Sequence, residues 1–353
     1  MLQDWRAFFF ASYDAKGFVT VDKPPMGLWI QTASAWLFGY HGWSILLPQI
    51  LASTGSVLLI FAIIRKPFGA IAGLLAALAL AVAPVNVAVA RNNSSDDVLA
   101  FFMLLGGVCV LRAARQGSLR WLALAMAALG VGFNIKMLEA YLALPAFVAL
   151  YLFAANAGFV RRIWHLAVAA VVLLTVSFSW ATAVALTPAS ERPYIGSTQN
   201  NSIFSLIFGY NGINRLLPRG WSIFGLTYSS SSSAGAFRGG GGVGGASENG
   251  PAGVLRLLNT QLGGQIGWLI PLALVGLVVA WGRPRLRNMT DRQRVLLLLG
   301  VWAATEITFF SVAGFYHRYY MATLSPSIAG LVGAGAVALW RAFRAGGWPS
   351  FLM

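Results

Sequence analysis

The sequence has very little charge and almost no cysteine. Charged residues make up 10% of its 353 residues and hydrophobic residues 58%, and the single cysteine, Cys109, lies inside an apolar run. A soluble domain carries about 25% charged residues, so this chain lacks the charge to cover a water-facing surface of its size. A single thiol excludes a disulfide framework and a cysteine-based metal site within one chain. The composition therefore predicts an integral membrane protein.

Long apolar runs are what the sequence has instead. Each approaches the ~20 residues that a helix needs to span a bilayer. We therefore expect an all-α bundle of about nine transmembrane helices. The runs cover about 43–64, 69–88, 98–114, 119–137, 140–158, 163–187, 264–282, 295–313 and 319–340.

Basic residues predict the orientation of these helices. The formal net charge is +15, and short basic clusters that follow every second run hold 14 of the 25 Lys and Arg residues. The positive-inside rule places such clusters in the cytoplasm. No solvated basic domain is present, so the charge does not indicate nucleic-acid binding. The clustered residues are Arg65, Lys66, Arg112, Arg115, Arg120, Arg161, Arg162, Arg283, Arg285, Arg287, Arg292, Arg294, Arg341 and Arg344.

The opposite, external side then receives eight of the ten acidic residues. External loops tolerate acids, which is one interpretation, and a polar site that opens on this face is the other. The resulting organisation is an external segment with an interfacial helix (1–42), transmembrane helices one to six (43–187), an external loop with a Gly/Ser-rich insert (188–263) and transmembrane helices seven to nine (264–353). We expect the insert, 229–250, to be flexible because of its low complexity.

The first candidate site is Asp-Lys-Pro-Pro at 22–25, before an apolar run over 25–40 that is too short to span a bilayer. That run predicts an interfacial helix. Lys23 is a point cation placed to meet a phosphate at the headgroup level. Asp22 could orient Lys23 or accept a proton, although an ordinary surface lysine before a turn also fits the pattern.

Two further groups of charged residues flank the apolar runs. Asp96 and Asp97 are adjacent, where Ser95 or Asp96 could cap a helix or a carboxylate could bind an acceptor hydroxyl, an amine or a divalent metal. Lys136 and Glu139 are three residues apart and could pair on one helix face. A lysine held there could instead bind phosphate.

Amide and aromatic side chains gather in the remaining external segments. Amides hydrogen-bond sugar hydroxyls and rings stack on sugar faces, although the same residues favour turns. The candidates are Tyr194, Asn200, Asn201, Tyr210 and Asn211 in the long loop, and His317, Arg318 and Tyr320 at the entrance to the last run.

Several motifs in order resemble the bacterial glycosyltransferase family 39 and ArnT-like group, relatives of aminoarabinose transferases and protein mannosyltransferases, in their mannosyltransferase-like branch. The resemblance implies a GT-C fold, a site on the external face and a polyprenyl-phosphate sugar as donor. It adds Gln265 to the candidates for substrate binding. The motifs are Val19–Pro25, Arg91–Asp96, Phe133–Tyr141, Asn200–Ser202, Phe208–Gly212, Gln261–Gln265 and Tyr316–Tyr320.

The chain also departs from this family. The family begins with a membrane span and an external loop that carries an acidic residue treated as the catalytic base, and we expect that region to precede Met1. The second loop reads Ser-Ser-Asp-Asp where the family has an Asn-Pro-Asp-like pattern, which makes Asp96 the better match and Asp97 its neighbour.

These features predict a membrane enzyme that moves a sugar from a polyprenyl phosphate to an acceptor at the outer face. Asp22, Asp96 and Asp97 are the catalytic candidates, and Lys23 and Lys136, with His317 and Arg318, would neutralise the departing phosphate. No cofactor is required, and a divalent metal at the paired aspartates is possible. The acceptor stays open. A transporter or flippase is the alternative, but it predicts a midplane site and internal repeats, and a third reading is an inactive fragment of the transferase.

Overall fold

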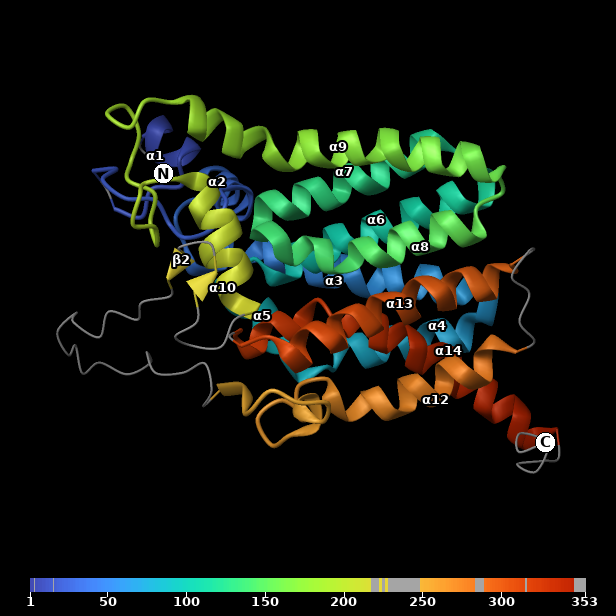
Figure 1. Cartoon of the computed structure of the whole chain (residues 1–353). Coiled ribbons are helices and arrows are strands. Elements are labelled where there is room, and N and C mark those ends of the chain that lie inside the picture. Colours follow the sequence, from blue (N-terminus) through green and yellow to red (C-terminus); the bar gives the residue numbers. More distant parts are fainter. Residues whose placement is uncertain are drawn as a thin grey trace.

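The computed structural model describes residues 1–2, 4–14, 16–216, 222–223, 226–227, 248–282, 289–314 and 316–345. Long helices form a bundle, and short helices and loops gather at one end of it (Figure 1). Most of the predicted Gly/Ser-rich insert lies outside the described residues, as do Arg283, Arg285 and Arg287 of the fourth basic cluster.

The bundle helices follow the apolar runs of the sequence. They are α3 (Gly42–Phe68), α4 (Ala70–Ala81), α5 (Pro84–Ala90), α6 (Asp96–Gln116), α7 (Leu119–Lys136), α8 (Leu144–Ala154), α9 (Phe159–Leu186), α12 (Ile270–Trp281), α13 (Asp291–Val312) and α14 (Ser325–Arg344). The shorter elements are α1 (Trp5–Phe9), α2 (Met26–Phe38), η1 (Met137–Ala143), η2 (Ser205–Ile213), α10 (Asn214–Leu216), the paired strands β1 (Ser222–Ile223) and β2 (Leu226–Thr227), η3 (Arg256–Leu258), η4 (Gly267–Leu269) and η5 (Arg318–Ala322).

Six helical segments are long and apolar enough to cross a membrane, or seven if α4 and α5, which meet at a 61° bend, form one span. The expected nine spans are therefore not nine full-length helices among the described residues. The segment Leu119–Ala154 counts as one of the six, although it covers most of two of the expected runs, 119–137 and 140–158. It reverses between α7 and α8, since the amide of Asn156 donates to the carbonyl of Ala114 at the end of α6, 2.8 Å away. The run near 264–282 forms the shorter apolar helix Gly267–Trp281.

The described basic clusters come together at one end of the bundle. Arg292 Nε, at the start of α13, donates to the carbonyl of Pro67 at the end of α3, 2.8 Å away. Arg115 Nε, near the end of α6, lies 3.0 Å from Asp291 Oδ1. At 1.5 Å per residue α6 is about 30 Å long, so its first residue, Asp96, lies at the far end of the bundle.

Small residues let α14 pack closely against its neighbours. A Cβ atom on Gly335 would lie 2.3 Å from the Cα of Gly276 in α12, and one on Gly333 would lie 2.4 Å from the carbonyl oxygen of Ala72 in α4. In a membrane, helix association depends on close packing of this kind, because lipid removes the hydrophobic driving force between helices. Replacement of these glycines would push α14 away from α4 and α12.

Backbone pairing fixes the N-terminal loop at the other end of the bundle. The amide of Thr20 donates to the carbonyl of Tyr194 at 2.9 Å, and the amide of Tyr194 donates to the carbonyl of Phe18 at 2.8 Å. Helix α2 then packs on the loop before α6, where a Cβ atom on Gly27 would lie 2.9 Å from the Cβ of Ser95. These contacts bring the segment 22–25 beside the first turn of α6.

Candidate functional site

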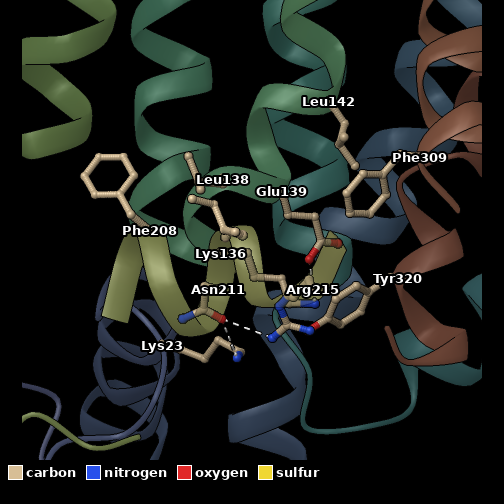
Figure 2. A pocket seen from close by; sticks show the side chains of 12 residues that line it. Lys23, Lys136, Leu138, Glu139, Leu142, Phe208, Asn211, Arg215, Phe309 and Tyr320 are labelled. Atoms are coloured by element: carbon tan, nitrogen blue, oxygen red, sulfur yellow. Dashed lines mark hydrogen bonds and ion pairs between the residues drawn. The ribbon is translucent and has the colours of Figure 1, made fainter. Parts of the chain in front are cut away.

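A cavity of about 190 Å³ lies at the end of the bundle that holds the N-terminal loop. We call it the first cavity, and Figure 2 shows the side chains around it. The N-terminal loop, the end of α7, η1, η2, α10, α13 and η5 all contribute to its wall. Its lining residues are Lys23, Lys136, Leu138, Glu139, Leu142, Phe208, Asn211, Gly212, Ile213, Arg215, Phe309 and Tyr320.

Three cations converge on the first cavity, and aromatic rings separate them. Lys136 Nζ lies 3.8 Å from the centroid of the Tyr320 ring, and the Arg215 guanidinium carbon lies 5.2 Å from the same centroid. Lys23 Nζ lies 5.7 Å from the centroid of the Tyr210 ring. Cation–π contacts offset part of the repulsion between these charges. The concentration of positive charge suits an anionic ligand.

Asn211 links the loop that carries Lys23 to the helix that carries Arg215. Its side-chain oxygen accepts hydrogen bonds from Lys23 Nζ at 3.3 Å and from an Arg215 Nη at 3.1 Å. Its Nδ2 donates to the backbone carbonyl of Asp22 at 3.0 Å. Asn211 lies in the π-helical turn η2, which contains non-helical backbone at Gly212. Such turns recur at functional sites, and this one aims Asn211 and Arg215 at the N-terminal loop (Figure 2).

A buried ionic group forms the second part of the site. Lys136 Nζ lies 2.5 Å from Asp96 Oδ1 and 3.4 Å from a Glu139 carboxylate oxygen. The structure thus joins the pair predicted from the three-residue spacing and adds Asp96, to which the Ser94 hydroxyl also donates. Ser95 occupies the N-cap position of α6, but its side chain makes no capping hydrogen bond. Asp96 therefore faces the site rather than capping its helix.

In the N-terminal loop, Asp22 and Lys23 each favour the ionised form of the other. Burial lowers the pKa of Lys23, although the neighbouring Asp22 carboxylate opposes this shift. Burial acts to raise the pKa of Asp22, but the charge of Lys23 and the hydrogen bonds from Lys23 and Tyr210 outweigh it and hold that pKa below its usual value. Burial and the Asp22 charge raise the pKa of Tyr210. Asp22 is therefore ionised and Tyr210 neutral near pH 7.

A second cavity, of about 260 Å³, adjoins the first and shares Lys23 and Lys136 with it. The carboxylates of Asp22 and Asp96 line this second cavity, together with Ser94 and Tyr319 among others. The two lysines thus stand between a cationic cavity and a cavity that offers carboxylates. This arrangement can neutralise an anion on one side while a carboxylate accepts a proton on the other.

A third cavity, of about 460 Å³, adjoins the second. The short helix η5 contributes to all three cavities, since Arg318 lines the third, Tyr319 the second and third, and Tyr320 the first. His317 Nδ1 instead lies 3.3 Å from a carboxylate oxygen of Glu248. The structure therefore separates His317 and Arg318 from the lysines with which they were predicted to neutralise a phosphate. Gln265 also lines the third cavity.

Six predicted site residues line none of these cavities, namely Asp97, Tyr194, Asn200, Asn201, Tyr210 and His317. Tyr194 pairs through its backbone with the N-terminal loop, and the side-chain oxygen of Asn201 accepts from the amide of Ile195 at 2.9 Å. Asn200 is exposed. Asp97 is buried, and one of its carboxylate oxygens has no hydrogen-bond partner among the described residues. Tyr194 and Asn201 support the loops around the site, which makes them positioning residues.

Arg215 is a site residue that the sequence analysis missed. It lies four residues after Asn211, the spacing that places two side chains on one helix face, but it stands at the edge of the long loop without a recognisable motif. A metal at Asp96 and Asp97 would need further protein ligands. The described residues contain no group of three or more His, Cys, Asp and Glu side chains that could hold a metal ion. Lys136 and Ser94 already engage Asp96.

Comparison with known proteins identifies relatives over the whole described chain. A family model for dolichyl-phosphate-mannose-protein mannosyltransferase matches residues 22–180. The mannosyltransferase-like proteins YycA and YkcB of Bacillus subtilis (strain 168) are 38% identical over 417 residues and 40% identical over 425 residues. Both alignments cover 100% of this chain but 61% of YycA and 59% of YkcB. The chain thus spans less than two thirds of the length of these relatives.

Solved structures share the same membrane fold. ArnT from Cupriavidus metallidurans bound to undecaprenyl phosphate matches with a TM-score of 0.60 and 25% identity, over 91% of this chain and 50% of that chain. The Archaeoglobus fulgidus oligosaccharyltransferase in the apo form matches with a TM-score of 0.54 and 16% identity, over 94% of this chain and 44% of that chain. At that identity the second match is evidence for the fold alone.

Proposed function

We propose that this chain, which is similar to ArnT and to protein-mannosyltransferase-related GT-C membrane proteins, belongs with them and transfers a sugar from a polyprenyl-phosphate donor to an acceptor on the external face of the membrane. The observation that carries this proposal is the composition of the first cavity. It combines the cationic side chains of Lys23, Lys136 and Arg215 with apolar walls. The donor and acceptor belong to the activity of the whole protein, of which this chain spans a part.

A polyprenyl phosphate has an anionic head and an apolar tail, and the first cavity suits both. Two of its three cationic side chains, Lys23 and Lys136, also line the second cavity. Leucine and phenylalanine side chains, Leu138, Leu142, Phe208 and Phe309, complete its wall. The match to ArnT solved with undecaprenyl phosphate supports a ligand of this class. We place the donor phosphate between Lys23, Lys136 and Arg215.

The transfer step follows from the two adjoining cavities. An acceptor oxygen attacks the anomeric carbon of the sugar, and the bond from that carbon to the phosphate oxygen breaks. The polyprenyl phosphate keeps the electron pair of that bond, and the three cations stabilise its charge. The acceptor proton passes to a carboxylate, for which Asp22 and Asp96 are the candidates because both line the second cavity.

The side of the membrane on which the cavities lie follows from the charges at the two ends of the bundle. Positive-inside orientation puts the end with Arg115 and Arg292 in the cytoplasm, and the cavities lie at the opposite end, about 30 Å away along α6. We therefore assign them to the external face. A transporter would need its site near the bilayer midplane, whereas Lys136 and Asp96 lie at the ends of their helices. Their position favours the transferase.

The donor proposal is tested by lipid retention. The protein is purified in mild detergent, supplied with polyprenyl phosphate and examined by native mass spectrometry as wild type, Lys23→Ala and Lys16→Ala. Lys16 is an exposed lysine of the same N-terminal loop, so it is the matched control for loss of one positive charge. We expect wild type and Lys16→Ala to retain the lipid and Lys23→Ala to lose most of it. Equal retention by Lys23→Ala would refute the assignment of the donor phosphate.

A further inference from the structure

The third cavity carries polar groups that the proposed donor site does not use. It is lined by Val85, Ala88, Val89, Asn92, Asn93, Ser94, Gln265, Arg318 and Tyr319. The exposed guanidinium of Arg318 has no hydrogen bond or ion pair within the described part of the chain, and neither do the side-chain amides of Asn93 and Gln265. Side chains of this kind offer donors and acceptors to a ligand.

The charge of the third cavity has one sign. Arg318 is the charged member of its described lining, and no carboxylate stands beside it there. The acidic residues near η5 are engaged elsewhere, since Glu248 lies 3.3 Å from His317 and Glu139 lies 3.4 Å from Lys136. An unneutralised guanidinium favours a phosphate or carboxylate, with which it forms paired, charge-assisted hydrogen bonds.

The third cavity also leads to the reaction centre. Asn93, Ser94 and Tyr319 line both it and the second cavity, and the Ser94 hydroxyl donates to Asp96. A ligand held by Arg318 can therefore extend past Ser94 toward Asp96. The ring of Tyr319 stands at the junction, where His317 stacks on it at 5.0 Å between centroids. That stacking restrains the ring that separates the two cavities.

From these observations we infer that the third cavity binds the acceptor, and that the acceptor is an anionic polyol or sugar with a phosphate or carboxylate group held by Arg318. This inference rests on the proposed transferase function and narrows its acceptor class. Asn93 and Gln265 hydrogen-bond the acceptor hydroxyls. One hydroxyl reaches Asp96, its oxygen forms the new bond to the anomeric carbon, its proton passes to the carboxylate, and the polyprenyl phosphate leaves with the electron pair.

The test measures acceptor binding apart from transfer. Protein in phosphatidylcholine nanodiscs loaded with polyprenyl phosphate is titrated with glycerol 1-phosphate and with glycerol, as wild type, Arg318→Gln and Arg318→Lys. Arg91→Gln is the matched control, because Arg91 is an exposed arginine beside the same loop that lines none of the cavities. A second arm replaces part of the lipid with phosphatidylglycerol and detects retained lipid by native mass spectrometry, which distinguishes a soluble phosphate from a lipid headgroup.

We expect wild type and Arg91→Gln to prefer the phosphate-bearing ligand by about tenfold in one arm, as one charge-assisted contact predicts. Arg318→Gln should lose that preference while it keeps the wild-type melting temperature, and Arg318→Lys should keep part of it. A preference that survives Arg318→Gln, or no preference in either arm, would overturn the inference. Failure to load polyprenyl phosphate, with Arg318-dependent phosphate binding intact, would instead sink the donor proposal and leave this cavity as an anion site.

Discussion

Lys136 Nζ lies 2.5 Å from Asp96 Oδ1, and this contact ties the last residue of α7 to the first residue of α6. Both side chains are almost fully buried, with 4% and 0% of their surface exposed. Burial of two charges costs several kcal/mol per ion, which a close, hydrogen-bonded pair offsets. The contact therefore holds a carboxylate at the boundary between the first and second cavities.

Loss of one partner of this pair should be costly. Lys136→Met leaves the Asp96 charge buried without its partner, and we expect the free energy of unfolding to fall by about 3–5 kcal/mol. Thermal or SDS unfolding in detergent measures this change. Arg115→Ala breaks the exposed pair with Asp291 and should cost less than about 1 kcal/mol. Equal losses in the two variants would contradict the structural role of the buried pair.

Arg215 should contribute to donor binding as strongly as Lys23. A hydrogen bond to a charged group contributes about 1.5–3 kcal/mol, so Arg215→Gln should weaken binding of polyprenyl phosphate by about ten- to a hundredfold. Titration of the lipid in nanodiscs measures the dissociation constant. Exposed Arg91 provides the control, since Arg91→Gln removes the same charge without touching the first cavity. An unchanged constant for Arg215→Gln would exclude the guanidinium from the phosphate site.

Donor capture should weaken at alkaline pH. Burial lowers the pKa of Lys23 from its usual value of 10.5, so its positive charge is lost at a lower pH than on an exposed lysine. Its neighbour Asp22 stays ionised over this range because the pKa of that carboxyl is lowered, and burial and the Asp22 charge raise the pKa of Tyr210 above its usual value. We expect kcat/KM for the donor to fall as pH rises toward 10.5. The fall should move to higher pH in Lys23→Arg, and an identical profile in that variant would remove Lys23 as its cause.

Close helix packing should make Gly335 sensitive to a single methyl group. Its added Cβ would meet the backbone of Gly276 at 2.3 Å, and overpacking of this kind costs about 1–3 kcal/mol. Gly335→Ala should therefore lower the melting temperature. The control Gly42→Ala places its methyl group where no atom lies within 4 Å, and it should leave stability unchanged or slightly higher. The prediction fails if both variants melt alike.

The side of the membrane on which each loop lies is the feature that the sequence predicts best. The alternation of basic clusters predicts that residues as distant as Asp22, Asp96 and Lys136 share one face, and the structure brings all three to the second cavity. The all-α membrane architecture also follows from the apolar runs, and the match to ArnT confirms the fold.

Other features depend on tertiary contacts that a single sequence does not encode in its periodicity. Arg215 enters the site because the π-helical turn η2 folds Asn211 back onto Asp22. His317 and Arg318 are neighbours in sequence, but the 3₁₀ geometry of η5 sends consecutive side chains in different directions.

The short helix η5 lines all three cavities, and this couples the binding of their ligands. Arg318, Tyr319 and Tyr320 are covalently consecutive, yet together they reach all three cavities. A displacement of this short helix that widens one cavity moves a wall of the others. Occupancies of the two ends of the site are then thermodynamically linked, and each ligand must change the affinity for the other by the same factor.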